Sequence, residues 1–309
     1  MSTKLVVGKG IVTPARVVGS DVNSAGTPPR VLRRLGSYLL FGGGAVGLLG
    51  GGLLGLLAVE GLIAKHVIGD ADGDAPNSDG VYGEELPGDA LSFVVLGDSA
   101  ACGYGVEDPA ETPGAMLGSG LAQLAGRPVR LRRVAVVGAE TKHLDNQLPE
   151  ALRAEPDVAL IIIGGNDVTH QTPPAQSVRP LVSAIETLRG AGSEVVVGTC
   201  PDLGTIRPLA PPLRQLARVW SRRLAEAQDR AASAAGARTV ALGSLLGPEF
   251  SAAPAELFGP DRFHPSATGY ASAAAAVLPQ LAAAVGAWPE DESGVPLGDG
   301  AILPITFTN

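Results

Sequence analysis

The chain has 309 residues, of which 45% are hydrophobic, 17% charged and 4% aromatic, and its formal net charge is −8. This length is enough for one large domain with a complete hydrophobic core. The acidic balance excludes a general nucleic-acid binder, because neutralising phosphates requires clustered lysine and arginine. With only two cysteines and four scattered histidines, the sequence excludes a disulfide framework and predicts neither a metal nor a cofactor.

The first 59 residues fall into two segments of very different composition. Residues 1–34 are rich in Gly, Pro, Ser and Thr without an apolar period, which predicts a disordered tail. Residues 35–59 contain no charge, and a helix of this length could cross a hydrocarbon core about 30 Å thick. We therefore predict an uncleaved signal anchor. Arginines 30, 33 and 34 precede it, so the positive-inside rule places the N-terminus in the cytoplasm and the rest of the chain outside; secretion after cleavage is the alternative.

Four glycines recur every fourth residue within this apolar segment. Small residues at this spacing allow two membrane helices to approach closely, which predicts a homodimer within the membrane. The four are Gly43, Gly47, Gly51 and Gly55. The next segment, residues 60–90, is acidic and rich in Gly and Pro, and we predict that it is a solvated linker.

From residue 91 onward, apolar runs alternate with Ala-rich stretches of helical period. Such alternation predicts a mostly parallel sheet covered by helices on both faces, within a domain spanning residues 91–287 and followed by a tail at 288–309. In this fold class the ligand crevice lies beyond the carboxyl ends of the strands. The predicted strands are 91–97, 129–137, 157–163, 194–199 and 238–242, and the predicted helices are 113–126, 141–153, 175–191, 212–235 and 266–286.

Polar residues suited to nucleophilic catalysis follow the first and last predicted strands. Ser99 comes directly after residues 91–97, and Asp261 and His264 lie in the loop after residues 238–242. A serine is a weak nucleophile until a neighbouring base takes its proton, and a neutral histidine suits that role. Asp261 could hold His264 in one tautomer and stabilise its imidazolium form. We therefore predict that these three residues are catalytic.

Two further strand ends supply groups that could stabilise an oxyanion. Gly138 follows the second predicted strand, and Asn166 follows the third in the sequence GGND. We expect the backbone N–H groups of Ser99 and Gly138 and the Asn166 amide to converge on the oxygen of the attacked carbonyl. Asp98 and Asp167, which adjoin these residues, are expected to organise the loops by binding nearby N–H groups.

These motifs resemble the four blocks of the SGNH (GDSL-type) hydrolase family. The matching stretches are GDSAACGYG, VVGAET, GGND and DRFHPSATGY, and the resemblance covers about residues 91–287. It implies a three-layer α/β/α, flavodoxin-like fold with a five-stranded parallel sheet, and ester hydrolysis without metal or cofactor. Matched by position, it implies the catalytic roles given above for Ser99, Asp261 and His264, and the oxyanion roles for Ser99, Gly138 and Asn166. One departure is Ala100, where the family motif has Leu.

The expected activity is that of a serine esterase or lipase acting on a small-molecule, lipid or glycan ester. Phe250, Phe258 and Phe263 are candidates for binding the acyl group. Deacetylation of a carbohydrate is an alternative within enzymes, and a non-catalytic, membrane-anchored binding module is an alternative outside them. The sequence leaves open whether Cys102 and Cys200, at the predicted rim of the crevice, form a disulfide.

Overall fold

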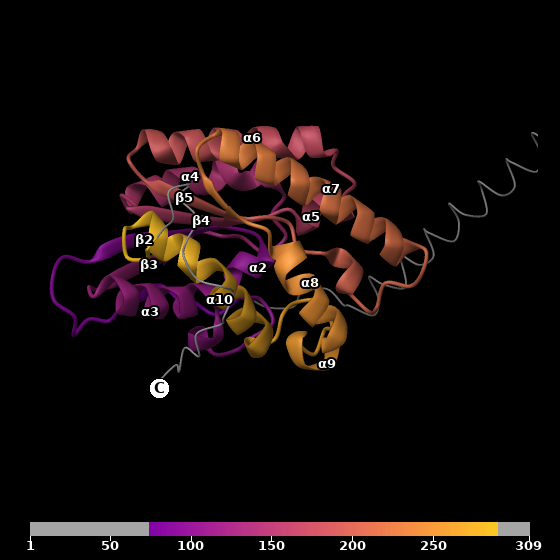
Figure 1. Ribbon diagram of the computed structural model, residues 1–309, viewed down its shortest axis with the longest axis horizontal. Coiled ribbons are helices and arrows are strands. Elements are labelled where there is room, and N and C mark those ends of the chain that lie inside the picture. The colour runs from indigo at the N-terminus through magenta and orange to yellow at the C-terminus, as the bar shows by residue number, and fades with distance from the viewer. Residues whose placement is uncertain (1–73, 290–309) are drawn as a thin grey trace, which may run out of the picture. The chain divides into compact units, whose positions relative to one another are not determined.

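The computed structural model describes residues 74–289 of the chain (Figure 1). The predicted tail at 1–34, the predicted membrane segment at 35–59 with its glycine stripe, and most of the predicted C-terminal tail lie outside the described residues. Between residues 74 and 289, no helix combines the length and the hydropathy needed to cross a membrane.

The sheet has six strands and is mixed. Its order is β1-β3-β2-β4-β5-β6, in which β1 runs antiparallel to β3 and every other neighbouring pair is parallel. The strands are β1 (Gly80–Tyr82), β2 (Leu91–Gly97), β3 (Val129–Arg133), β4 (Val158–Ile162), β5 (Glu194–Gly198) and β6 (Arg238–Val240). The expectation of five parallel strands is correct for β2 to β6, whereas a sheet of five strands in total is wrong.

The additional strand, β1, lies inside the segment predicted to be a solvated linker. It is only three residues long, and two of the three are exposed, so it carries no apolar run that would predict a strand. The Tyr82 hydroxyl donates to the Ser78 carbonyl at 2.7 Å, and its ring packs closely against Gly118. The ordered fold therefore begins before residue 91.

The third strand of the sheet in order along the chain, β3, is shorter than its apolar run predicts. The N–H groups of both Val134 and Ala135 donate to the single carbonyl of Val95, at 2.9 and 3.2 Å, which breaks the regular ladder after Arg133. One more hydrogen bond joins this segment to β2, from the Val136 N–H to the Gly97 carbonyl at 3.1 Å. The loop that leaves the sheet here leads to residues 138–141.

Helices cover both faces of the sheet, and α3, α4, α6, α7 and α10 agree closely with the five predicted helical stretches, whereas α8 and the short helices α2, α5 and α9 were not predicted. Thr112 caps the helix that starts at Pro113, and Ser266 caps the helix that starts at Ala267, as expected for side chains that satisfy free N–H groups. The helices are α2 (Ser99–Cys102), α3 (Pro113–Ala125), α4 (Leu144–Arg153), α5 (Gly165–Thr169), α6 (Pro174–Gly190), α7 (Leu213–Ala234), α8 (Leu242–Ala252), α9 (Pro254–Leu257) and α10 (Ala267–Ala284), with 3₁₀ turns η1 (Pro109–Glu111), η2 (Thr141–His143) and η3 (Leu203–Thr205).

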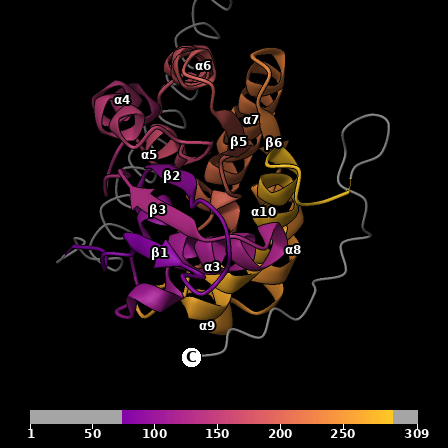
Figure 2. The same cartoon turned by 90° about the vertical axis from the view of Figure 1, so that its left-hand side faces the viewer.

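The described core has one apolar layer on each face of the sheet and a third cluster that includes Leu203, Phe250 and Phe258. Phe93 and Val95 of β2 pack with α3 and α10, whereas Val94 and Leu96 pack with α4 and α6. Figures 1 and 2 show these two groups of helices on opposite sides of the strands. All seven residues of β2 are buried, which is why the strand is apolar along its length except for Ser92.

The strand order changes direction at β2. From β2 the chain passes to β3 on one side, and then returns to β4 on the other side of β2. In open α/β sheets the crevice used for ligands lies outside the carboxyl ends of the strands at such a switch point. Here those ends are followed by Ser99 after β2 and by Asn166 after β4.

Candidate active site

Ser99 lies in a sharp turn at the carboxyl end of β2. Gly97 has φ +140°, and a Cβ at this position would lie 1.9 Å from the Ile162 carbonyl oxygen, so the strand requires glycine here. The Asp98 N–H donates to the same carbonyl at 3.1 Å, and the Asp98 carboxylate accepts the Ala100 N–H at 3.0 Å to cap α2. Ser99 thereby becomes part of the wall of a cavity at the open end of the sheet.

Asp98 is buried beside the candidate nucleophile. Burial raises the pKa of its carboxyl to about 6, against the opposing effect of hydrogen bonds from the backbone N–H groups of Ala100 and Gly164. The bond from the Ala100 N–H caps α2 and so organises the turn that carries Ser99. The expectation that Asp98 organises loops is therefore confirmed.

Ser99, His264 and Asp261 form a continuous series of hydrogen bonds. The His264 Nε2 atom lies 3.0 Å from the Ser99 Oγ atom, across a sequence separation of 165 residues. The other ring nitrogen, Nδ1, lies 2.6 Å from the Asp261 Oδ2 atom. These distances allow His264 to exchange a proton with the Ser99 hydroxyl while Asp261 fixes the ring.

The loop around His264 holds the imidazole in place through several contacts. The second oxygen of Asp261, Oδ1, accepts the backbone N–H groups of Phe263 and His264 at 2.9 and 3.0 Å. The ring of His264 makes edge contacts with Tyr104 and Phe263, with ring centroids 4.7 and 4.9 Å apart. The Gly259 N–H donates to the His264 carbonyl at 2.8 Å and closes the loop.

The charge of Asp261 is stabilised by the same contacts. Burial on its own would raise the pKa of the Asp261 carboxyl, but hydrogen bonds from the His264 ring and from the N–H groups of Phe263 and His264 outweigh it. The pKa of Asp261 is therefore lowered. An ionised carboxylate next to Nδ1 favours the tautomer of His264 in which Nε2 is free to accept a proton.

Asn166 and Gly138 lie in neighbouring segments, but only Asn166 lines the cavity beside Ser99. Asn166 lines the same cavity as Ser99, and its amide Nδ2 donates to the Ala139 carbonyl at 3.0 Å. Gly138, at φ +79°, lies one residue before Ala139 and lines a different, shallower pocket. The loop after β3 is thus brought beside Asn166. The residue in direct contact with the Asn166 amide is Ala139, whose apolar side chain gives no sign in the sequence that its carbonyl binds Asn166.

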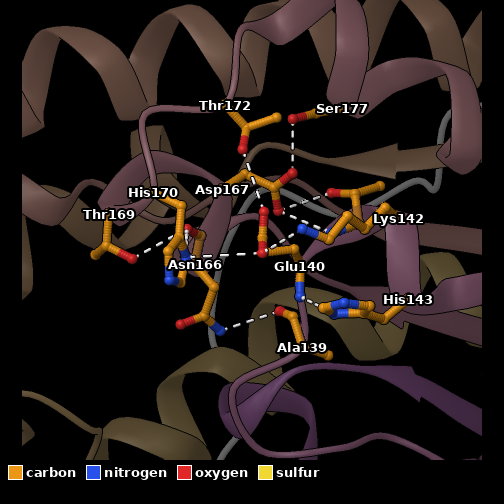
Figure 3. Close-up of polar contacts among 11 residues, drawn as sticks. Ala139, Glu140, Lys142, His143, Asn166, Asp167, Thr169, His170, Thr172 and Ser177 are labelled. Atoms are coloured by element: carbon orange, nitrogen blue, oxygen red, sulfur yellow. Dashed lines mark hydrogen bonds and ion pairs between the residues drawn. The ribbon is translucent and has the colours of Figure 1, made fainter.

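Asp167 binds the segments on either side of Asn166 together (Figure 3). Its buried carboxylate accepts three hydrogen bonds, from the Thr141 N–H and hydroxyl at 2.9 Å each and from the Ser177 hydroxyl at 2.6 Å. These donors belong to η2 and α6. Asp167 is therefore a loop organiser, as expected. It holds α5 in position against the loop that follows β3.

A second group of polar contacts in Figure 3 surrounds Glu140. Its carboxylate forms an ion pair with Lys142 at 2.8 Å and accepts the Thr172 hydroxyl at 3.2 Å. Its backbone N–H donates to the Nδ1 atom of His143 at 3.0 Å. On the other side, the exposed His170 contacts the Asn166 carbonyl through Nδ1 at 2.8 Å. His143 thus supports the start of η2, and His170 supports the turn at Asn166.

The cavity beside Ser99 has a volume of about 120 Å³ and walls that are mainly apolar. All three phenylalanines that the sequence analysis nominated for acyl binding line it, and Phe250 and Phe258 form an edge-to-face pair with centroids 5.0 Å apart. Further apolar walls come from the ends of two predicted strands and from residues 201–212 and 243–260. The apolar lining includes Ile162, Ile163, Leu203, Ile206, Leu242, Leu246, Phe250, Phe258 and Phe263.

Cys102 and Cys200 are both buried and both carry free thiols, so the disulfide left open by the sequence is not formed. Burial raises the pKa of Cys102 to about 11 and that of Cys200 well above its ordinary value. Among residues 74–289, no three His, Cys, Asp or Glu side chains gather in a way that could hold a metal ion.

A hydroxyl, an imidazole and a carboxylate bonded in series, at the switch point of a doubly wound sheet, define a serine hydrolase. Residues 95–272 match the GDSL-like Lipase/Acylhydrolase family, and the chain belongs to this family. It is a GDSL/SGNH-type hydrolase that acts on ester bonds.

Individual relatives agree with this assignment. The chain is 42% identical over 211 residues to the GDSL-like esterase Rv1075c of Mycobacterium tuberculosis. The aligned residues cover 64% of this chain and 67% of the relative. The crystal structure of TesA superposes with a TM-score of 0.51 at 21% identity, covering 62% of this chain and 98% of TesA. A lipase/acylhydrolase from Enterococcus faecalis gives the same score and identity over 61% of this chain and 93% of its own. The two structures support the fold.

Proposed function

We propose that the protein hydrolyses carboxylic esters with a short to medium apolar acyl group, through an acyl-enzyme on Ser99. The observation that carries this proposal is the bonded series Ser99–His264–Asp261 in the wall of an apolar cavity. An apolar wall favours an alkyl chain, because each buried methylene contributes about 0.8 kcal/mol relative to water.

In the first half of the reaction, the Ser99 Oγ atom attacks the ester carbonyl carbon while its proton passes to the His264 Nε2 atom. The carbonyl oxygen becomes an oxyanion, which the N–H groups of Ser99 and Gly138 and the Asn166 amide stabilise. The intermediate collapses, the bond to the alcohol oxygen breaks, and the alcohol leaves with the proton from His264. An acyl group is then esterified to Ser99.

In the second half, a water molecule takes the place of the alcohol. His264 accepts a proton from the water as its oxygen attacks the acyl carbon, and returns that proton to Ser99 Oγ as the carboxylic acid is released. Asp261 remains ionised throughout and stabilises the imidazolium that forms in each half.

The size of the cavity predicts an acyl-chain optimum of about four to six carbons, because an apolar cavity of roughly 150 Å³ accommodates a benzene ring. We expect kcat/KM to rise about threefold to fourfold per methylene from C2 to that optimum and to fall beyond it. The measurement is hydrolysis of p-nitrophenyl esters from C2 to C16. Leu246→Ala, which enlarges the cavity, should shift the optimum to longer chains.

Leu245→Ala provides the matched control, because Leu245 is 57% exposed and does not line the cavity. This variant should keep the wild-type optimum. An optimum at the acetyl ester would instead favour the carbohydrate deacetylase, and no hydrolysis by the folded protein at any chain length would favour the binding module.

We also propose that residues 35–59 anchor the hydrolase in a membrane as a single span, with the N-terminus cytoplasmic, residues 60–309 outside, and the glycine stripe pairing two copies. The uncharged apolar composition of the segment supports this. The full chain is expected to stay in the membrane fraction after alkaline carbonate washing, and a chain starting at residue 66 to be released. Recovery of the full chain in the wash, or of a shortened chain in the medium, would refute the membrane anchor. Crosslinking in membranes that yields only monomers would refute the pairing of two copies.

A further inference from the structure

Two buried glutamines bind the backbone at the carboxyl edge of the sheet, directly before the two turns that carry Ser99 and Asn166. Gln147 belongs to α4 and is 3% exposed, and Gln228 belongs to α7 and is fully buried. Neither lines the cavity beside Ser99. Burying a carboxamide is unfavourable unless it is fully hydrogen-bonded, so its partners indicate its purpose.

Gln147 uses both ends of its carboxamide on the peptide groups of Gly97. Its Oε1 atom accepts the Gly97 N–H at 2.9 Å, and its Nε2 atom donates to the Gly97 carbonyl at 2.8 Å. The regular pairing of β2 with β3 ends at Val95 and Arg133; beyond it the Gly97 carbonyl still accepts the Val136 N–H, but the Gly97 N–H has no strand partner on this side. The carboxamide supplies the acceptor that the Gly97 N–H lacks and a second donor to the Gly97 carbonyl. Gly97 lies two residues before Ser99.

Gln228 acts in the same way between the next two strands. Its Nε2 atom donates to the Ile163 carbonyl at 2.9 Å, and its Oε1 atom accepts the Cys200 N–H at 2.7 Å. The last regular pair of β4 and β5 is Ile162 with Gly198, so the glutamine joins the two strands beyond the point where their own ladder ends. Ile163 lies three residues before Asn166.

We propose that Gln147 and Gln228 are positioning residues: Gln147 holds the turn of the nucleophile, and Gln228 holds the turn of the oxyanion donor. The inference rests on the proposed roles of Ser99 and Asn166. Without these bonds the strand ends keep unpaired buried N–H and C=O groups and shift to satisfy them. A displacement of about 1 Å at the reacting groups costs on the order of 10²-fold in rate.

The first test replaces each glutamine with leucine, which has a similar volume and cannot hydrogen-bond. For Gln147→Leu and Gln228→Leu we expect kcat to fall about 10- to 100-fold while KM changes less than about threefold. The control is Ser193→Ala. Ser193 is equally buried and donates to the Pro156 carbonyl at 2.6 Å, next to β4 and β5 but at their opposite ends. Its kcat should stay within about twofold of the wild type. Wild-type kcat in both folded leucine variants, or an equal loss in Ser193→Ala, overturns the proposal.

A double-mutant cycle tests whether Gln228 acts through Asn166. Asn166→Ala is expected to lower kcat about 10²–10³-fold on its own, as the loss of one oxyanion donor does elsewhere. Adding Gln228→Leu should then cost less than about twofold more, whereas adding Gln147→Leu should retain its full cost, because it acts through Ser99. Full additivity of Gln228→Leu with Asn166→Ala overturns the assignment of Gln228 to the oxyanion turn.

Gln147→Glu provides a second variant in case the leucine variant does not fold. A protonated carboxyl accepts the Gly97 N–H and donates to its carbonyl as the carboxamide does, but an ionised one cannot donate. Burial raises the pKa of such a glutamate towards neutrality, so kcat of Gln147→Glu relative to wild type should fall as the pH rises from about 5 to 8. A constant ratio overturns the proposal. Ser99→Ala, measured in parallel, distinguishes failure of the proposed function from failure of this inference. An active Ser99→Ala refutes the proposed function. An inactive Ser99→Ala together with unaffected glutamine variants refutes the positioning role of the glutamines alone.

Discussion

Replacing Ser99 with alanine is expected to lower kcat by about 10⁴-fold or more, because the members of such a triad act as a unit and none of the others can form the acyl-enzyme. The Ser99 hydroxyl bonds to the His264 Nε2 atom, so its removal leaves the turn, with its backbone bonds through Asp98, intact. The midpoint of thermal unfolding should therefore change little. The measurement is single-turnover and steady-state hydrolysis of the best ester of the chain-length series.

A second readout of this variant is covalent labelling. A phosphonate ester that reacts with activated serines should modify the wild type at one peptide containing Ser99 and should leave Ser99→Ala unlabelled. Ester hydrolysis by Ser99→Ala at more than a few per cent of the wild-type rate would contradict the assignment of the nucleophile. Labelling at another serine would show which residue carries the reaction instead.

Replacing Asp261 with asparagine is expected to cost about 10⁴-fold in kcat, the size of effect seen when a triad carboxylate becomes an amide. The substitution retains an acceptor for the Phe263 and His264 N–H groups, which bind Oδ1, and so preserves the loop. It places an NH₂ group where Oδ2 now faces the Nδ1 atom of His264. The imidazole then carries its proton on Nε2, from which it cannot accept the proton of Ser99.

The pH dependence provides a check on this explanation. Because the pKa of Asp261 is lowered, its carboxylate is ionised over the whole neutral range, so Asp261→Asn should lose kcat at every pH between about 6 and 8. Asp108→Asn is the matched control, since Asp108 also accepts a nearby N–H, from Ala110 at 2.9 Å, but on the exposed turn η1. Its kcat should equal that of the wild type. A loss of less than about 10-fold in Asp261→Asn would show that His264 does not depend on this carboxylate.

The sequence predicts the central strands of the fold well and its margins poorly. Residues 91–97 and 157–163 are recognisable because a strand buried on both faces is a continuous apolar run. The apolar run 129–137 suggested a longer strand than β3, since nothing in Val134 or Ala135 shows that both donate to one carbonyl. The strand β1 was missed because three residues, of which two are exposed and one is a glycine, carry no periodic signal.

The candidate site was predictable to the extent that its residues follow strand ends. The positions of Ser99, Asn166, Asp261 and His264 in the sequence already imply that they meet at one edge of the sheet. Gln147 and Gln228 were not predictable in the same way. Each lies among polar residues in an amphipathic helix, where a glutamine is typical of the solvent-facing side, and only the packing of α4 and α7 shows that both are buried.

The two edge strands of the described sheet affect the tendency of the protein to aggregate at high concentration. The outermost strands, β1 and β6, each have three residues, so each exposes at most a short row of unpaired N–H and C=O groups. A long, flat outer strand is a template for adding a strand from a second molecule, and very short ones are a common protection against it. Between them, the strands β2 to β5, which include those that precede Ser99 and Asn166, are paired on both sides. The apolar strands of this hydrolase are thus shielded from the edge-to-edge joining that leads to aggregates.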